Sequence, residues 1–333
     1  MTLRRERLIF SLGLGLLICL LATPLQAVVI VDDSWADGDL AKTGALDTDW
    51  YTSTSSSADE VGVGFMGLVT GTSGRGLHTT FPTQSLANVG DAIKVSWTFT
   101  TPDTVTPGGG RGSALRFGLF DNLGRLTANN PSIDPTDSQT DTCCLDAAIS
   151  ASSGSPNAVY GWGLANGGPG TEPIPGYMLT MDVNNDADDD DMTFRRHNRE
   201  FPTITGTGRG MSTTSGFVNL GSGPDDGFGF EPNTEYSGMY TIGRFSPTEL
   251  GLRFDLVTPQ GSFKHIDIDD GFDSVDFGYF GVHVNSRTFG SSNTADEPDN
   301  GVDFTNVKIE FLTGRVVPEP TSLALLMGAF VLI

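Results

Sequence analysis

Apolar and polar side chains alternate along much of the chain, and this alternation predicts β-strands. Ile93, Val95, Trp97 and Phe99 alternate with lysine, serine and threonine residues. Successive side chains of a strand point to opposite sides of a sheet, so such a segment has one apolar face and one polar face. We therefore expect Trp97 to lie in the core. The same patterns predict strands over residues 61–69, 114–120, 177–183, 192–197, 236–245, 250–256, 277–284 and 302–312.

The spacing of these strands predicts an all-β fold. The chain contains 43 Gly and 18 Pro, and segments rich in both, such as 106–110 and 165–170, separate the strands. Between the two termini we find no ten-residue stretch with a clean helical period. Antiparallel strands without helices must stack as two sheets or close into a barrel. We predict one antiparallel β-sandwich over residues 28–312, with a hydrophobic helix outside it at each end.

The N-terminal segment has the composition of a secretory signal peptide. Three arginines in the first seven residues precede an uncharged run over residues 8–21, and Pro24 and Ala27 follow it. A basic region, an apolar region and a small residue at the cleavage position are typical of such signals. We predict that residues 1–27 are a signal peptide that is removed after Ala27.

The C-terminal segment begins with a stiff hinge. Pro318 and Pro320 flank Glu319, and each proline fixes φ and disfavours helix at the residue before it. The uncharged run over residues 323–333 follows, and it is about half of the ~20 residues that cross a membrane. We therefore expect the natural sequence to continue past Ile333 with more apolar residues and then Arg or Lys.

Pro318, Glu319 and Pro320, followed by the apolar run, resemble the PEP-CTERM sorting signal of Gram-negative bacteria. The resemblance implies that residues 313–333 are a sorting tail, that the tail enters the inner membrane transiently, and that exosortase processes it. It also implies that the folded body works at the cell surface or in an exopolysaccharide matrix.

Two further segments resemble the opening and final strands of concanavalin A-like jelly rolls. They are residues 31–39, with Trp50 soon after, and residues 302–310. The resemblance implies a jelly-roll form of the β-sandwich and transfers no site residue.

The formal net charge of −22 restricts the partners of the chain. An acidic surface repels nucleic acid, and no cluster of lysine and arginine with interleaved aromatic residues offsets it. We therefore predict no nucleic-acid partner. The same field attracts cations.

An acidic segment between two predicted strands is a candidate calcium site. Oxygen-bearing residues occupy its alternate positions, namely Asp182, Asn184, Asp186, Asp188 and Asp190. Calcium takes six to eight oxygen ligands, and a loop with this spacing can bring them around one ion. The spacing resembles the first part of an EF-hand or dockerin loop, although Ala187 and Thr193 stand where those loops have glycine and a closing carboxylate. The alternative is a solvated hairpin tip.

No catalytic motif is recognisable. Glycoside hydrolysis needs two carboxylates that face each other across the bond, and no such pair occurs on one strand face. Asp267, Asp269 and Asp270 come nearest, but they lead into a glycine and indicate a strand that ends in a loop, where they form a solvated acidic turn. The four histidines lack zinc-site spacing, so we expect them to be satisfied locally, and no Gly-x-Ser-x-Gly elbow is present.

Carbohydrate binding is the remaining function that the residues suggest. Tyr160 and Trp162 lie among glycines before a loop, where an exposed ring could stack on a sugar. The alternative is that Trp162 anchors the loop or lies in the core. We predict an exported, non-catalytic glycan-binding or structural protein. The alternative is a polysaccharide-active enzyme with an unrecognised site.

Overall fold

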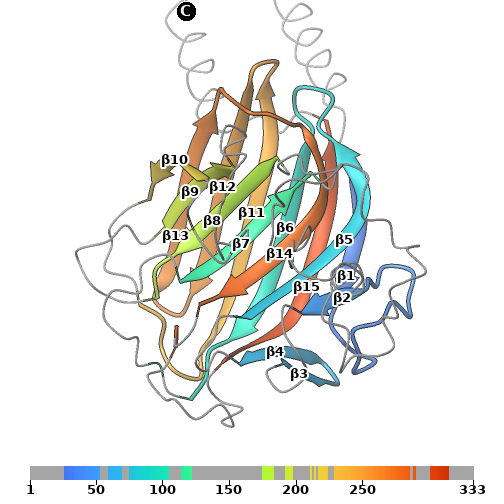
Figure 1. The fold of residues 1–333 in the computed structure, drawn as a ribbon, viewed down its shortest axis with the longest axis vertical. Helices are drawn as coiled ribbons and strands as arrows, with labels where there is room; N and C mark the ends of the chain where they lie inside the picture. The colour runs from blue at the N-terminus through green and yellow to red at the C-terminus, as the bar shows by residue number, and fades with distance from the viewer. Residues whose placement is uncertain are drawn as a thin grey trace, which may run out of the picture.

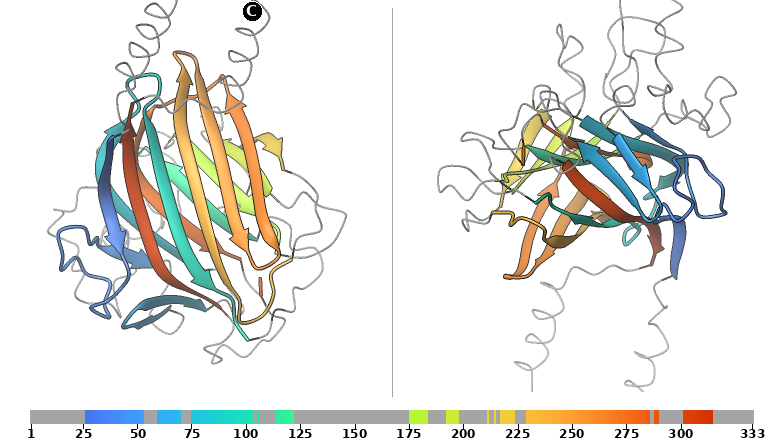
Figure 2. Two further views of the ribbon diagram at one scale, coloured as in Figure 1. Left: turned by 180° about the vertical axis from the view of Figure 1, so that it is seen from behind. Right: turned by 90° about the horizontal axis from the view of Figure 1, so that it is seen from below.

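The computed structural model describes most of the predicted body of the chain. The described residues are 26–52, 59–69, 75–103, 105, 114–121, 175–183, 192–197, 211, 214, 217–223, 229–285, 288–289 and 301–314. They form two antiparallel sheets packed face to face, and Figures 1 and 2 show the two layers from the front, from behind and from below. Among these residues no helix has the length and apolar character needed to cross a membrane.

The eight-stranded sheet lies behind in Figure 1 and in front in the left panel of Figure 2. In spatial order its strands are β13 (Gly261–Asp269), β12 (Glu249–Thr258), β11 (Glu235–Ser246), β6 (Ala92–Thr100), β15 (Gly301–Thr313), β4 (Phe65–Val69) and β3 (Asp59–Gly62). The strand β1 (Gln26–Asp33) also pairs with β15, so the first and last described strands are neighbours.

The seven-stranded sheet lies in front in Figure 1. In spatial order its strands are β10 (Phe217–Ser222), β9 (Met192–His197), β8 (Gly176–Met181), β7 (Leu115–Phe120), β14 (Asp276–Val284), β5 (Arg75–Ser85) and β2 (Trp50–Thr52). The chain crosses between the sheets from β5 to β6 and again from β6 to β7, and β14 later enters between β5 and β7. This crossing connectivity confirms the predicted antiparallel β-sandwich of jelly-roll type.

The core lies between the sheets and is centred on Trp97. This side chain is 1% exposed, and its ring stacks on Phe117 at a centroid distance of 3.9 Å and on Phe254 at 6.0 Å. Phe117 belongs to the opposite sheet, so the stack joins the two layers. The prediction that Trp97 is a core residue is confirmed.

Most of the predicted strand segments were right in position, but one of them is divided, and β2, β5, β10 and most of β13 were not among the predictions. Residues 61–69 do not form one strand, because a turn at Gly64 with φ of +89° divides them into the hairpin β3–β4. Only the acidic end of β13 was recognised as part of a strand, because the alternation of β13 is inverted. Ile266 and Ile268 are 50% and 49% exposed, whereas His265 and Asp269 point into the sandwich and are buried.

The segment between β1 and β2 is anchored by a buried carboxyl group. The Asp33 carboxylate oxygens accept hydrogen bonds from the Trp35 backbone N–H at 2.8 Å and from Trp50 Nε1 at 2.6 Å. Burial, and next a side-chain hydrogen bond with Asp47, raise the pKa of Asp33 to about 7, while the bond from Asp33 helps to lower the pKa of Asp47. Asp33 therefore holds a proton to higher pH than Asp47 does.

The raised pKa of Asp33 predicts a pH dependence of stability. Because the pKa of Asp33 is higher in the folded state than its ordinary value of 3.8, the folded protein binds more protons between about pH 4 and 7. Protonation of Asp33 therefore contributes to the free energy of unfolding at low pH. This contribution is lost as the pH rises to 7. Asp33→Asn keeps a donor for Asp47 without a titrating proton. Denaturant titrations of both proteins across this pH range measure the effect, and the variant should gain stability relative to wild type as the pH rises. A difference in the free energy of unfolding that stays constant with pH would contradict the raised pKa of Asp33.

Candidate functional site

The candidate site is the outer face of the seven-stranded sheet. Phe117, Phe194 and Phe280 point into the main core from β7, β9 and β14. Side chains at the alternate positions of these strands therefore face away from the core. Strand register then decides which of these outward residues are neighbours across the sheet.

The register arranges the outward residues in three rows that cross the strands. The aromatic row contains Phe217, His197, Phe120 and Tyr279. The glycine row contains Arg195, Met178, Gly118, Gly281 and His78. The polar row contains Thr193, Thr180, Arg116 and His283. The glycine row lies between the other two, so aromatic rings stand on one side of it and hydrogen-bonding groups on the other.

The rings of the aromatic row contact one another. Tyr279 is 5.9 Å from Phe120 between centroids, and Phe120 is 6.3 Å from Phe217, both edge to face. The His78 ring of the glycine row stacks on Tyr279 at 5.5 Å with an interplanar angle of 23°. Phe120, Tyr279, Met178 and Met211 form an apolar cluster outside the main core, and Phe217 packs against it.

The polar row has a positive charge. Arg195 Nε donates to Thr180 Oγ1 at 3.3 Å, and Arg116 lies beside Thr180 on the next strand. Burial, and next the charge of Arg195, lower the pKa of Arg116 to about 10. Burial and the charge of Arg116 lower the pKa of His283 to about 3, so its imidazole is neutral at physiological pH. The polar row therefore contains one guanidinium group and a neutral imidazole, and Arg195 of the neighbouring glycine row adds a second guanidinium group beside Thr180.

The glycine row leaves space above the sheet, which Met211 occupies. A Cβ at Gly118 would lie 2.8 Å from Met211 Sδ, and one at Gly281 would lie 3.1 Å from the same sulfur. Glycine is therefore required for this close approach. Arg116 Nη1 donates to the Met211 carbonyl oxygen at 2.5 Å, so one residue contacts both the glycine row and the polar row.

His197 departs from the expectation that the histidines are satisfied locally. It is 1% exposed, and neither ring nitrogen has a hydrogen-bond partner among the residues that the structure describes. Its ring meets Phe217 edge to face at 5.1 Å, and burial lowers its pKa to about 4. A buried, neutral imidazole thus lies in the aromatic row, next to Phe217 of the edge strand β10.

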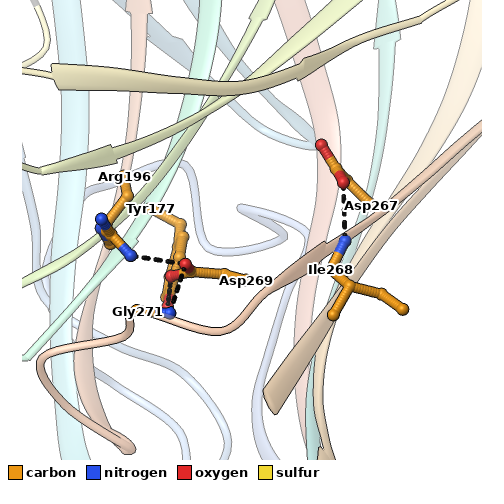
Figure 3. Close-up of polar contacts among 6 residues, drawn as sticks. All are labelled: Tyr177, Arg196, Asp267, Ile268, Asp269 and Gly271. Carbon is orange, nitrogen blue, oxygen red and sulfur yellow. Dashed lines mark hydrogen bonds and ion pairs between the residues drawn. The ribbon is translucent and has the colours of Figure 1, made fainter.

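A second polar cluster joins the two sheets, and Figure 3 shows it. Asp269 Oδ2 accepts from the Tyr177 hydroxyl at 2.7 Å, and Oδ1 accepts from Arg196 Nη1 at 2.5 Å and from the Gly271 backbone N–H at 2.9 Å. Burial and the charge of Asp269 raise the pKa of Tyr177. The predicted solvated turn at Asp267, Asp269 and Asp270 is therefore wrong for Asp269, which is 2% exposed. Its position is structural, since every partner belongs to the sandwich.

Most of the residues singled out in the sequence lie outside the described residues. These are Tyr160, Trp162, Asn184, Asp186, Asp188, Asp190, Pro318, Glu319 and Pro320. Asp182 is described and is buried, and its Oδ1 accepts from the Val183 backbone N–H at 2.6 Å. The described part of the chain contains no group of three His, Cys, Asp or Glu residues that could hold a metal ion.

The outer-face residues were missed because no local motif contains them. His78 and His283 lie far apart in the sequence, and only strand pairing brings them to one face. A weak signal was present nonetheless. Gly118 lies between Phe117 and Leu119, and Gly281 lies between Phe280 and Val282. Two apolar strands with a glycine at the centre of the non-core face suggest close approach of another group.

No protein-family model matches this chain, and no curated protein matches it by sequence. Several solved structures are similar in fold. The exoplasmic/lumenal domain of VIP36, in its Ca²⁺- and mannose-bound form, is 9% identical with a TM-score of 0.43, over 88% of this chain and 91% of that one.

Two alginate lyases are also similar. A mutant of Aly36B in complex with an alginate tetrasaccharide is 12% identical with a TM-score of 0.39, over 85% of this chain and 96% of that one. The marine PL-14 alginate lyase from Aplysia kurodai is 13% identical with a TM-score of 0.36, over 86% of this chain and 99% of that one. Identities and scores of this size transfer no function to this chain.

Proposed function

We propose that the outer face of the seven-stranded sheet binds a carbohydrate chain and that the protein is a non-catalytic glycan-binding protein. The observation that carries the proposal is the parallel arrangement of the aromatic row and the polar row on one face. Ligand sites combine apolar and aromatic surface with a few placed polar groups. Sugar rings present both kinds of surface, with apolar C–H faces and hydroxyl edges.

The length of the rows favours a polymer over a small molecule. The glycine row crosses five strands, β9, β8, β7, β14 and β5. Neighbouring strands are about 4.8 Å apart, so four spacings give roughly 19 Å. An extended oligosaccharide can contact the whole row, whereas a single sugar contacts only part of it.

The same face supports an enzymatic alternative. His283 is neutral at physiological pH and lies beside Arg116 in the strand register, and a neutral imidazole can accept a proton from a substrate. Incubation of the purified protein with a bound polysaccharide, followed by a reducing-end assay, separates the two functions. New reducing ends that His283→Ala abolishes would favour the enzyme.

The binding test uses Tyr279, whose ring ends the aromatic row on β14 and contacts both Phe120 and His78. Tyr279→Leu removes the stacking surface but keeps an apolar side chain, so glycan affinity should fall about tenfold, which corresponds to about 1.4 kcal/mol. Affinity electrophoresis of the full protein in gels with dissolved polysaccharides measures this change. Met239→Ala, on the outer face of the eight-stranded sheet, is the control and should bind as wild type does. Equal mobility of wild type and Tyr279→Leu in every polysaccharide would refute the site.

The setting that we propose for this function is the cell surface or the exopolysaccharide matrix. The signal-like residues 1–27 and the motif Pro318, Glu319 and Pro320 support export and processing by exosortase. The alternating carboxylates that begin at Asp182 support a calcium ion as an accessory ligand. Recovery of Met1 at the N-terminus of the mature protein would contradict the export part of this proposal.

A further inference from the structure

We propose that the protein forms a two-fold homodimer through the outer face of its eight-stranded sheet, around β12 and β13. The left panel of Figure 2 shows this sheet in front. The partner is a second copy of this chain, because the residues of the face complement themselves in shape and in charge. The dimer goes beyond the proposed glycan binding, which concerns the other sheet, and does not depend on it.

Exposed apolar side chains gather on this face beside an open furrow. Three of the seven large hydrophobic residues that are exposed in the described part of the chain lie on β12 and β13, namely Val257, Ile266 and Ile268, at 54%, 50% and 49%. The strand register places Gly251 beside Ile268 and Gly243 beside Gly251, and both glycines are partly exposed. A Cβ at Gly251 would come no closer than 3.9 Å to the Gly243 carbonyl oxygen, so the space above it is open. The face thus has both apolar side chains that project and a furrow that can receive one.

The charges of this face are balanced, although the chain as a whole has a net charge of −22. Three of the four lysines of the chain lie on it, namely Lys94, Lys264 and Lys308. Glu310 forms ion pairs with Lys94 and Lys308, and the Asp255 carboxylate accepts from Arg253 Nε at 2.6 Å and from Nη2 at 2.9 Å. Two copies of an acidic protein repel each other, so contact is favoured where cations offset the carboxylates.

The partner stacks on the face and does not extend the sheet from its edge. β13 is the edge strand next to β12, but the Ile268 backbone N–H already donates to Asp267 Oδ1 at 2.7 Å. Lysine and inward-pointing charged residues on an edge strand oppose pairing with another chain, and β13 contains Lys264 and Asp267. The exposed isoleucines therefore contact a partner that lies above the sheet.

The face is large enough for a specific interface. The five neighbouring strands β13, β12, β11, β6 and β15 span about 24 Å at roughly 4.8 Å per strand, and nine residues of a strand span about 30 Å. Their outer face is then roughly 700 Å², close to the about 800 Å² that each partner buries in a standard interface.

A two-fold axis that crosses the strands level with Phe254 makes β12 complementary to itself. Arg253 and Asp255 flank Phe254, so this axis places Arg253 of each copy opposite the partner's Asp255. Gly251 and Val257 are also equally far from Phe254, so Val257 of each copy enters the furrow at the partner's Gly251. Such an interface is isologous, since both copies contribute the same residues. Packed sheets cross at about 30°, so the match is closest on β12, near the axis.

The same operation keeps like charges apart on the other strands of the face. Arg253 lies in one cross-strand row with Lys94 and Glu310, and Asp255 lies in the next row with Ser96 and Lys308. The axis exchanges the two rows, so Glu310 of each copy is opposite the partner's Lys308 and Lys94 is opposite the partner's Ser96. Opposite charges across an interface fix its register and suppress other arrangements.

Sedimentation velocity of the full protein over a wide range of concentration measures the association. At about 0.15 M salt the distant acidic residues of the two copies are largely screened from each other. Wild type should approach twice the mass of one chain as its concentration rises. The mass of one chain at every concentration up to the solubility limit would overturn the proposal.

Val257→Asp tests the furrow contact. The variant places a carboxylate opposite the partner's Gly251, where it loses water without gaining a partner, so the dissociation constant of the dimer should rise about tenfold or more. Val63→Asp is the matched control, because Val63 is 77% exposed and lies in the turn between β3 and β4, at the other end of the sheet from β13. Equal weakening in both variants would show a general effect of added negative charge, and no weakening in Val257→Asp would place the contact elsewhere. Either result overturns the proposal.

A charge exchange on β12 tests the two-fold arrangement. Asp255→Arg should dissociate the dimer, because Arg253 of each copy would then be opposite an arginine of its partner. Adding Arg253→Asp to the same chain reverses the pair and should restore the dimer. A double variant that stays monomeric, or an Asp255→Arg variant that still dimerises, would refute this arrangement. Circular dichroism checks that each variant is folded, and if Asp255→Arg does not fold, the comparison of Val257→Asp with Val63→Asp decides.

Discussion

Asp269→Ala should lower the free energy of unfolding by about 3 kcal/mol, at the lower end of the range for breaking a buried ion pair. The substitution removes the acceptor for Tyr177, Arg196 and the Gly271 backbone N–H at once. The loss is at the lower end because the Arg196 side chain is 22% exposed and can reach water. Denaturant titration of the purified protein measures the change.

Asp267→Ala is the matched control on the same strand and the same face. The Asp267 Oδ1 atom accepts only from the neighbouring Ile268 backbone N–H at 2.7 Å among the bonds between described residues, and its Oδ2 atom is buried without a partner there. Removing an unsatisfied buried acceptor offsets the loss of one local hydrogen bond, so stability should change by less than about 1 kcal/mol. Similar losses in the two variants would contradict the inter-sheet role of Asp269.

Trp97→Ala should cost about 3–5 kcal/mol, because the side chain is fully buried and its removal leaves a cavity between the sheets. Gly238→Ala should cost about 1–3 kcal/mol through overpacking. Gly238 is the cross-strand partner of Trp97, and a Cβ there would lie 2.5 Å from Trp97 Cε2. These two effects have one origin, the contact between the indole and the bare backbone of Gly238.

The double variant tests that common origin. In a Trp97→Ala background the added methyl group of Gly238→Ala meets no indole, so its cost should vanish. Thermal or denaturant unfolding of the four proteins completes the cycle. Additive losses would show that Gly238 is required for backbone conformation and not for packing against Trp97.

The sequence by itself determined the fold class and most strands. Alternation along β6 and β12 followed directly from the period of a strand with one buried face, and the structure confirms both strands. The strand β8 was also predicted from its alternation, but all six of its residues are buried. Trp97 could be assigned to the core for the same reason. Such predictions succeed because they depend on a residue and its neighbours two positions away, which the sequence displays without knowledge of strand partners.

Local patterns failed where a partner from elsewhere in the chain changed the environment. Asp269 looked like part of a solvated turn, yet it is buried because Arg196 and Tyr177 of the other sheet supply its hydrogen bonds. The inverted alternation of β13 has the same cause, since its inward polar residues include Asp269 and also His265, whose ring stacks on Phe194 at 4.7 Å. A charge is expected at the surface unless it is paired, and pairing cannot be seen in the local sequence.

The outer-face site was decided by the tertiary structure alone. Arg116, Tyr279 and His78 come from three strands that are distant in sequence, and each follows the ordinary alternation of its own strand. Shifting one strand by a single residue would send its outward residues to the core. The crossing connectivity and the cross-strand register therefore create the aromatic, glycine and polar rows, because both depend on long-range pairing that the period of a single strand does not contain.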